Sequence, residues 1–203
     1  TLVLGERIRC MASVTLGLLR HGETDWNVQS RLQGTSDIPL NETGIMQAVR
    51  AARAIDAADW DIIVSSPLSR ARETARIISD ANALGEVIIE PLLLERAFGE
   101  AEGLNYHEWK LTHDPSQGIP GGESLAELET RANGLLAEFA KRFAGKRVLA
   151  VSHGALIRKV VRVASAKTLP LEGDRFANTS LTKLKHDGST WSVTHYNPDP
   201  LGS

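Results

Sequence analysis

Three short segments of the sequence each combine two of the residue types arginine, histidine and serine with a glycine or a proline. They are Arg20-His21-Gly22, Ser65-Ser66-Pro67 followed by Arg70, and Ser152-His153-Gly154. Arginine offers a forked pair of N–H donors that matches the oxygens of a phosphate. A phosphate monoester is a dianion near neutral pH, because its second pKa is about 6. These residue types therefore indicate that Arg20 and Arg70 could bind a phosphate beside a reactive histidine.

Histidine can supply the nucleophile for such a site. An imidazole between two arginines can be held neutral if one ring nitrogen donates to a backbone carbonyl. The other nitrogen of His21 could then attack phosphorus, and His153 could stabilise the transferring phosphoryl group by hydrogen bonding. A carboxylic acid must also protonate the leaving alkoxide. The chemistry thus requires an acidic residue in addition to the three segments.

The secondary structure predicted around these segments places all three at one edge of a sheet. Apolar runs at 14–19, 61–65 and 148–152 are predicted strands, and each ends at one of the segments. Ser66 is predicted to cap the next helix, with Pro67 at its first position. The further predicted strands are 87–90, 180–185 and 191–196.

Capping residues and apolar spacing predict the helices. Asn41 is a favourable N-cap, and Ser124 with Glu127 matches a capping box. The apolar residues expected on one helical face are Ile45, Ala48, Val49, Ala52 and Ile55 after Asn41, Leu128, Leu135 and Phe139 after Ser124, and Ile157, Val160 and Val161 after Gly154. A further helix is expected to run through Arg70, Arg72, Ala75 and Ile78. Strands alternating with helices predict an α/β three-layer sandwich, with a mostly parallel central sheet and helices on both faces. Ligands bind at the carboxyl ends of the strands in such sheets.

Bulk properties exclude several classes of partner. The chain has 203 residues and a formal net charge of −2, without basic runs, so neither nucleic acid nor a membrane surface is an expected partner. Cys10 is the single cysteine, which fits a reducing, cytoplasmic setting. Met11 is a candidate natural start. On that interpretation residues 1–10 are an extension or cloning remnant and residues 11–203 form a single domain, as a monomer or a homodimer.

The residues around His21 are similar to a known signature. The stretch L-L-R-H-G-E-T-D-W-N at 18–27 resembles that of the histidine phosphatase superfamily, also called the phosphoglycerate mutase-like family. The resemblance continues, in the family's order, through R-L-Q-G-T-S-D-I-P-L-N-E-T-G at 31–44, S-S-P-L-S-R-A-R-E-T-A at 65–75, L-L-E-R-A-F-G-E-A-E-G at 93–103, G-G-E-S at 121–124 and V-S-H-G at 151–154. A lone R-H-G would be weak evidence, whereas the ordered set is specific and spans most of the chain.

The resemblance implies a phosphoglycerate mutase-like fold and a role for each matching residue. His21 is similar to the nucleophile that becomes phosphohistidine, and Arg20, Arg70 and His153 to the rest of the catalytic pocket. Glu95 matches the residue that acts as general acid and then as base toward water, with Glu100 and Glu102 as alternatives in the same loop. The residues implied to bind the phosphate or substrate are Asn27, Gln33, Gly34 and Gly154. The family needs no metal and no cofactor, and the spacing of the histidines matches no metal motif.

Three functions stay open on the sequence. The leading interpretation is a phosphatase acting on a small phosphomonoester, and the alternative is a cofactor-dependent phosphoglycerate mutase. Phe98 stands where the mutase branch has a tyrosine, and residues 103–120 contain no arginine, which favours hydrolysis, whereas Arg96 fits a mutase. A non-catalytic protein that binds a phosphorylated ligand is the third possibility.

The substrate is not determined at this level. The family also includes sugar bisphosphatases and ribazole phosphatases, and residues 103–120 are the expected specificity segment. Trp26, Tyr106 and Trp109 could form an apolar pocket lip that favours hydrophobic esters. Because the general acid must be protonated in order to donate, hydrolysis is expected to favour acidic to neutral pH.

Overall fold

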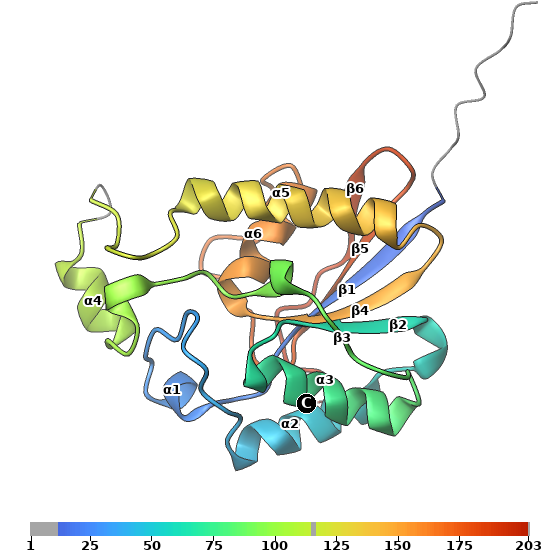
Figure 1. Ribbon diagram of the computed structural model, residues 1–203, viewed down its shortest axis with the longest axis horizontal. Helices are drawn as coiled ribbons and strands as arrows, with labels where there is room; N and C mark the ends of the chain where they lie inside the picture. The colour runs from blue at the N-terminus through green and yellow to red at the C-terminus, as the bar shows by residue number, and fades with distance from the viewer. Residues whose placement is uncertain (1–11, 115–116, 203) are drawn as a thin grey trace, which may run out of the picture.

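The computed structural model describes residues 12–114 and 117–202. The predicted extension at residues 1–10 lies outside the described residues. Within those ranges, six strands form one sheet that is covered by helices on both faces (Figure 1). The predicted α/β three-layer architecture with a mostly parallel sheet is therefore confirmed.

The sheet has the strand order β3-β2-β4-β1-β5-β6. The strands are Val14–Arg20 (β1), Ile62–Ser65 (β2), Ile88–Ile89 (β3), Arg147–Ser152 (β4), Leu181–His186 (β5) and Trp191–His195 (β6). β1, β2, β3 and β4 run parallel, while β5 is antiparallel to both β1 and β6. The predicted strands are all present, with ends displaced by at most one residue, and the third is shorter than expected.

The helices are Asp25–Val28 (α1), Glu42–Ala54 (α2), Ser69–Asn82 (α3), Tyr106–Thr112 (α4), Leu125–Arg142 (α5) and Gly154–Ala164 (α6), with short 3₁₀ turns at Ala57–Asp59, Pro91–Leu93 and Gly99–Ala101. The predicted caps of α2 and α5 are confirmed. Asn41 accepts a hydrogen bond from the Gly44 N–H at 2.8 Å, and Ser124 and Glu127 form a reciprocal capping box that satisfies N–H groups of the first turn.

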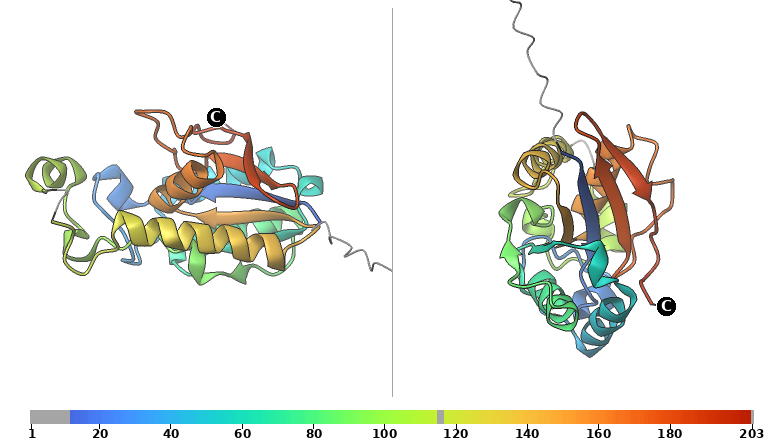
Figure 2. Two further views of the ribbon diagram at one scale, coloured as in Figure 1. Left: turned by 90° about the horizontal axis from the view of Figure 1, so that it is seen from above. Right: turned by 90° about the vertical axis from the view of Figure 1, so that its right-hand side faces the viewer.

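Helices cover both faces of the sheet (Figures 1 and 2), and a hydrophobic core lies beneath them on each face. α5 and α6 pack on one face around residues such as Phe139 and Leu156. α2 and α3 pack on the other face around residues such as Trp60, Ile78 and Leu149. Because both faces of the central strands are covered, β1 and β4 are apolar along almost their whole length.

Two local predictions were wrong. α3 begins at Ser69 with Leu68 at the N-cap position, so Ser66 does not cap it; the buried Ser66 hydroxyl instead lies 2.7 Å from Nε2 of His153. Ile45 is 42% exposed, because the buried stripe of α2 begins at Gly44. A Cβ on Gly44 would lie 2.1 Å from the Glu23 carbonyl oxygen, so close backbone contact rotates Ile45 outward.

The strand order brings the three chemistry-bearing segments together. β4 lies between β1 and β2, and Arg20 is in register with Ser152. The His21 N–H donates to the Ser152 carbonyl at 3.0 Å, and the Ser66 N–H donates to the Val151 carbonyl at 3.0 Å. The segments therefore follow adjacent strand ends. Beyond this edge projects the connection that carries α4 (Figure 2).

In the part of the chain that the structure describes, no helix combines the length and the apolar character needed to cross a membrane.

Candidate active site

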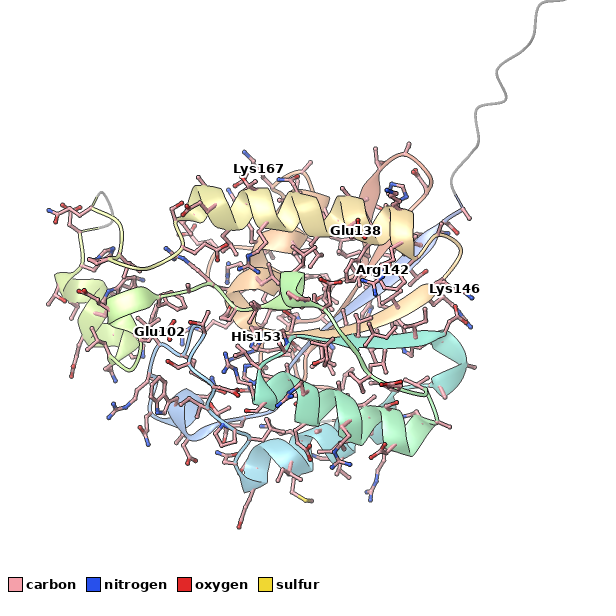
Figure 3. The ribbon with its side chains drawn as sticks, in the orientation of Figure 1. Glu102, Glu138, Arg142, Lys146, His153 and Lys167 are labelled. Carbon is pink, nitrogen blue, oxygen red and sulfur yellow. The ribbon has the colours of Figure 1, made fainter. Side chains whose placement is uncertain are left out.

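A cavity of about 700 Å³ opens at the edge of the sheet where the three segments meet. It is lined by every predicted site residue except His153: Arg20, His21, Asn27, Gln33, Gly34, Arg70, Glu95 and Gly154. His153 lies directly behind His21, with ring centroids 5.1 Å apart. Figure 3 shows His153 near the centre of the molecule, at the end of β4. The sequence motifs thus converge on one cavity.

His21 is buried as a neutral imidazole. Its Nδ1 lies 2.6 Å from the Gly22 carbonyl oxygen, and since a carbonyl can only accept, the proton is assigned to Nδ1. Burial, followed by the charges of Arg70 and Arg20, lowers the pKa of His21 well below its usual value, although the bond to Gly22 opposes the shift. Nε2 has no hydrogen-bond partner among the described residues. This geometry leaves the Nε2 lone pair available for attack on an electrophile in the cavity.

Arg70 is held rigidly although it is only 1% exposed. Its guanidinium donates to the carbonyls of Ser36 at 2.7 Å and Gly34 at 2.8 Å, and its Nε donates to Nδ1 of His153 at 3.2 Å. Burial lowers the pKa of Arg70 to about 10, so the group is still cationic at neutral pH. A fixed buried cation at the cavity wall suits a phosphate oxygen.

Arg20 has a donor that the protein leaves unused. Its Nη1 donates to the Phe176 carbonyl at 2.6 Å, whereas its buried Nε has no partner within the described residues. Burial lowers the pKa of Arg20, and nearby Glu95 opposes that shift. A buried N–H without an acceptor costs free energy, and an anion in the cavity would supply the acceptor.

His153 is placed differently from the role that the resemblance implies. It is fully buried, and because Nδ1 accepts from Arg70, Nε2 carries the proton and donates to the Ser66 hydroxyl at 2.7 Å. Burial, and then the charges of Arg70 and Arg20, lower its pKa well below the usual value. In this arrangement His153 orients Arg70, and a bond to a phosphoryl oxygen would require exchange of the contact with Ser66.

Glu95 is the acidic residue that the structure brings beside the arginines. Its carboxylate accepts from the backbone N–H groups of Ala155 and Leu156, both at 3.1 Å, and of Arg96 at 2.9 Å. The first two groups belong to the start of α6, where unpaired N–H groups and the helix dipole favour an anion. Glu95 is thereby fixed at the cavity wall next to Gly154.

A half-buried ion pair holds the backbone that carries Glu95. Arg131 of α5 donates to the carbonyls of Leu92 at 3.1 Å, Leu94 at 2.7 Å and Glu95 at 3.3 Å. The same guanidinium makes a two-point contact with Glu123 at 2.8 and 2.7 Å. Neither Arg131 nor Glu123 lines the cavity, so the pair supports the acid from behind.

The two alternative acids have other positions. Glu102 accepts from the backbone N–H groups of Thr35, Ser36 and Phe98 and from the Ser36 hydroxyl. Burial alone would raise the pKa of Glu102, but these hydrogen bonds together bring it below its usual value. Glu100 is exposed, and neither residue lines the cavity. Of the three candidate acids, Glu95 is therefore the one that reaches the cavity.

Amide side chains complete the inner cavity. Oδ1 of Asn27 accepts from the Thr24 N–H at 3.1 Å and from Nδ2 of Asn178 at 3.3 Å, which leaves its NH₂ group for a ligand. Gln33 is 8% exposed and its Oε1 has no partner within the described chain. Asn178 also donates to the His21 carbonyl at 2.9 Å and lines the cavity.

Sequence reasoning missed Asn178. The usable signal was topological, because a strand antiparallel to the first begins at the edge where the first ends. That rule would have pointed to the segment just before the predicted strand 180–185.

The aromatic lip is present in part. Trp26 and Tyr106 line the cavity together with Phe98 and Phe176. Trp109 does not line it, because it packs against His113 with ring centroids 4.5 Å apart.

No group of three or more His, Cys, Asp or Glu side chains within residues 12–114 and 117–202 is arranged to hold a metal ion.

Comparison with known proteins identifies the family. The model of the histidine phosphatase superfamily (branch 1) matches residues 16–199. The chain is 39% identical over 180 residues to the uncharacterized phosphatase PhoE of Bacillus subtilis, covering 89% of this chain and 92% of PhoE. It is 35% identical over 198 residues to the probable phosphoglycerate mutase GpmB of Photorhabdus laumondii, covering 91% of each protein.

A solved structure agrees with the sequence matches. The crystal structure of phosphoserine phosphatase from Entamoeba histolytica, in complex with 3-phosphoglyceric acid, superposes with a TM-score of 0.78 at 30% identity and covers 94% of this chain and 100% of the other. Both phosphatases and mutases therefore occur among the relatives. From the matched motifs, the fold and these likenesses, the chain belongs to the histidine phosphatase superfamily.

Proposed function

We propose that the protein hydrolyses a small phosphomonoester through a phosphohistidine intermediate on His21. The observation that carries this proposal is the state of His21, whose Nδ1 is bound to the Gly22 carbonyl at 2.6 Å while the neutral ring faces a cavity that Arg20 and Arg70 also line. A neutral imidazole is a nucleophile, and two fixed cations favour binding of a phosphate dianion beside it.

In the first half-reaction the phosphoryl group moves to the enzyme. The Nε2 lone pair of His21 forms a bond to phosphorus, and the bond from phosphorus to the ester oxygen breaks, its electron pair going to that oxygen. Protonated Glu95 gives its proton to the leaving oxygen, so an alcohol departs and Glu95 becomes a carboxylate. Arg20 and Arg70 stabilise the charge on the phosphoryl oxygens throughout the step.

In the second half-reaction water replaces the alcohol. The Glu95 carboxylate removes a proton from a water molecule, whose oxygen bonds to phosphorus while the phosphorus–nitrogen bond breaks. The electron pair returns to Nε2, inorganic phosphate is released, and Glu95 is again protonated for the next cycle. The α6 N–H groups that hold Glu95 at 3.1 Å would stabilise its anionic form between the two steps.

The other lining groups have supporting roles in this proposal. The free NH₂ group of Asn27 donates to the phosphoryl group, and the absence of a side chain at Gly154 gives it room, since a Cβ there would lie 3.6 Å from Arg20 Nε. Gln33 and Gly34 border the space for the leaving group. Arginine and amide donors supply the stabilisation of charge, and the proposed reaction uses no metal and no cofactor.

The main alternative is a mutase, as the likeness to GpmB indicates. A mutase would form the same phosphohistidine but return the phosphoryl group to a sugar acid instead of to water. The third possibility, a binding protein, would form no phosphohistidine. The fate of the phosphoryl group therefore separates all three.

The test is rapid-quench labelling with a radiolabelled phosphomonoester, with phosphate release followed in parallel. Wild type is expected to carry acid-labile label and to release phosphate steadily, and His21→Ala is expected to do neither. His195→Ala, which removes an exposed histidine of β6, is the matched control and should behave as wild type. Stable label with little release would instead indicate the mutase, and binding without label or release would indicate the binding protein.

A further inference from the structure

The cavity that contains His21 carries an excess of positive charge. Six of its lining residues are cationic and two are carboxylates. The cations are Arg20, Arg31, Arg70, Lys110, Arg158 and Arg175, and the carboxylates are Glu95 and Asp174. The phosphoryl group of a simple ester would engage Arg20 and Arg70, which leaves four cations unused by the proposed function.

These four outer cations come from separate parts of the chain. Arg31 follows α1, Lys110 lies on α4, Arg158 lies on α6, and Arg175 lies in the connection between α6 and β5. None of them forms an ion pair within the residues that the structure describes. Arg31 donates to the Gly103 carbonyl at 3.0 Å, and Arg158 donates to the Asp174 carbonyl, but a backbone carbonyl carries no net charge. Their positive charge is therefore directed to the cavity and to solvent.

Asp174 does not neutralise Arg158 or Arg175 by direct pairing. Its Oδ2 accepts from the Tyr196 hydroxyl at 2.5 Å and from the Leu171 N–H at 2.9 Å. Burial, and then the hydrogen bond to Asp174, raise the pKa of Tyr196, so the phenol keeps its proton and holds the carboxylate. The short connection that contains Arg175 is thus anchored at its carboxylate while its arginine is left unpaired.

Arg158 and Arg175 are tied to the phosphoryl pocket by the backbone. Gly154 and Arg158 are four residues apart on α6, so they share one face and lie about 6 Å apart along the helix axis. Gly154 adjoins Arg20, as the 3.6 Å approach of a Cβ shows. Arg175 directly precedes Phe176, whose carbonyl accepts from Arg20 at 2.6 Å. The two outer arginines therefore line the cavity next to the residues that adjoin Arg20.

We infer that Arg158 and Arg175 bind a second anionic group on the leaving-group part of the substrate. The substrate class is then a phosphomonoester with a carboxylate or a further phosphate, in preference to an uncharged aryl or sugar ester. This inference rests on the proposed function and specifies the substrate of the same site. The aromatic residues of the lip contribute contact area, and the arginines select charge.

The test compares two aryl phosphates of nearly equal shape. Para-carboxyphenyl phosphate carries the second anion, and para-carbamoylphenyl phosphate is its neutral counterpart. Wild type is expected to favour the carboxylate by about tenfold in kcat/KM, mainly through KM, which is the factor expected for one charge-assisted hydrogen bond of about 1.4 kcal/mol. Arg158→Gln and Arg175→Gln should each remove most of that preference while changing kcat/KM for the neutral ester by less than about twofold.

A matched control and a third compound sharpen the result. Arg162→Gln changes an exposed arginine one turn further along α6 that does not line the cavity, so the preference should be unaffected. Para-phenylene bisphosphate carries a second phosphate in place of the carboxylate. If its kcat/KM falls more in Arg158→Gln and Arg175→Gln than that of the carboxylate ester, the arginines prefer phosphate. A larger fall for the carboxylate ester shows that they prefer carboxylate.

The failures of the two proposals are distinguishable. If both esters label His21 and the preference is the same in wild type, Arg158→Gln and Arg175→Gln, the inference is overturned and the phosphatase stands. If no ester labels His21, the proposed function fails. Calorimetry then measures the affinity of wild type, Arg158→Gln and Arg175→Gln for the two esters. Equal affinity of wild type for both esters would contradict the proposed anion subsite.

Discussion

At the scale of single residues, the structure keeps two buried histidines uncharged beside two arginines. His21 and His153 are at most 3% exposed, and burial together with neighbouring positive charge lowers the pKa of both. The proposed role of His21 as a nucleophile requires this neutral state. The neutral state of both histidines also makes the stability of the protein depend on pH, because the same groups titrate normally in the unfolded chain.

The stability of the protein should fall as the pH is lowered below about 6.5. In that range an unfolded histidine takes up a proton that the folded protein excludes, so the unfolded state binds more protons and the free energy of unfolding decreases. Each histidine contributes a slope of up to about 1.4 kcal/mol per pH unit, until the pH falls below its lowered pKa in the folded state.

Urea denaturation between about pH 7.5 and about pH 5, in buffers free of phosphate, measures this slope. His21→Asn and His153→Asn should each reduce the slope, whatever their effect at neutral pH. His195→Asn, at an exposed position, should leave it unchanged. An equal slope in wild type and both buried-site variants would show that these histidines are not the cause.

Glu95→Gln should separate substrates by the basicity of their leaving groups. An alkyl phosphate needs a proton on the departing oxygen, and loss of the general acid should lower its rate of phosphohistidine formation by about 10²–10⁴-fold. Para-nitrophenyl phosphate needs little protonation, so its phosphohistidine should still form but should accumulate, because no base activates water. Rapid-quench labelling measures both effects, and an equal loss for the two esters would count against Glu95 as the acid. In wild type, the expected preference for acidic to neutral pH stays a prediction.

At the scale of elements, connections between the strands orient the reactive side chains. The loop at 34–36 supplies two carbonyls to Arg70 and is itself held by Glu102. Gly34 has a φ of +54°, and a Cβ there would lie 2.0 Å from Glu102 Oε1. A side chain at this position would therefore disturb both the loop and the arginine that it holds.

Gly34→Ala should destabilise the protein more than a matched glycine substitution does. Gly85 also has a positive φ of +84°, but a Cβ there would meet nothing within 4 Å. Backbone strain is common to both and is on the order of 1 kcal/mol, so the excess for Gly34→Ala reports the clash with Glu102. Denaturant unfolding and kcat/KM measure the outcome. Gly34→Ala should lose activity and Gly85→Ala should not, and equal behaviour of the two would contradict the proposed clamp.

The ion pair of Arg131 and Glu123 should act on catalysis through Glu95. If it positions the acid, Arg131→Lys and Glu123→Gln should lower kcat for an alkyl phosphate more than for para-nitrophenyl phosphate, by about tenfold or more. General destabilisation would lower both alike. The control is Arg142→Gln, which breaks the ion pair with the buried carboxylate of Glu90 at 2.9 Å away from the cavity. A leaving-group effect of the same size in this control would overturn the positioning role.

At the scale of the whole molecule, one sheet joins two hydrophobic cores. Figure 1 shows α5 and α6 on one face and α2 and α3 on the other. Phe139 is fully buried in the first core and Trp60 is 5% exposed in the second. Because β1 and β4 contribute side chains to both cores, damage on one face should be transmitted to the other through the shared strands.

Phe139→Ala should therefore lower the stability of both faces together, by about 3–5 kcal/mol. Far-ultraviolet circular dichroism reports the helices and strands, and fluorine NMR of fluorotryptophan-labelled protein reports Trp60 on the opposite face. Coincident transitions at a lower denaturant concentration are expected. Separate transitions, with Trp60 unaffected, would contradict a single cooperative unit.

The sequence by itself determined the order of the elements, the caps at Asn41 and Ser124, and the set of residues that gather at the strand ends. These depend on local periodicity, capping chemistry and short motifs, so a few neighbouring residues suffice. It failed at Ser66 and Ile45, where the same local rules predicted a cap and a buried face. Contacts with His153 and with the backbone near Glu23 prevailed there.

Only the tertiary structure decided how those residues are used. The placement of β4 between β1 and β2 sets His153 behind His21 and pairs it with Arg70. The antiparallel return of β5 brings Asn178 to the His21 carbonyl, and the connection before it brings Arg175 to the cavity. These contacts join positions more than 80 residues apart in the chain. Strand order and the packing of distant segments establish them, and neither is written in any local pattern of the sequence.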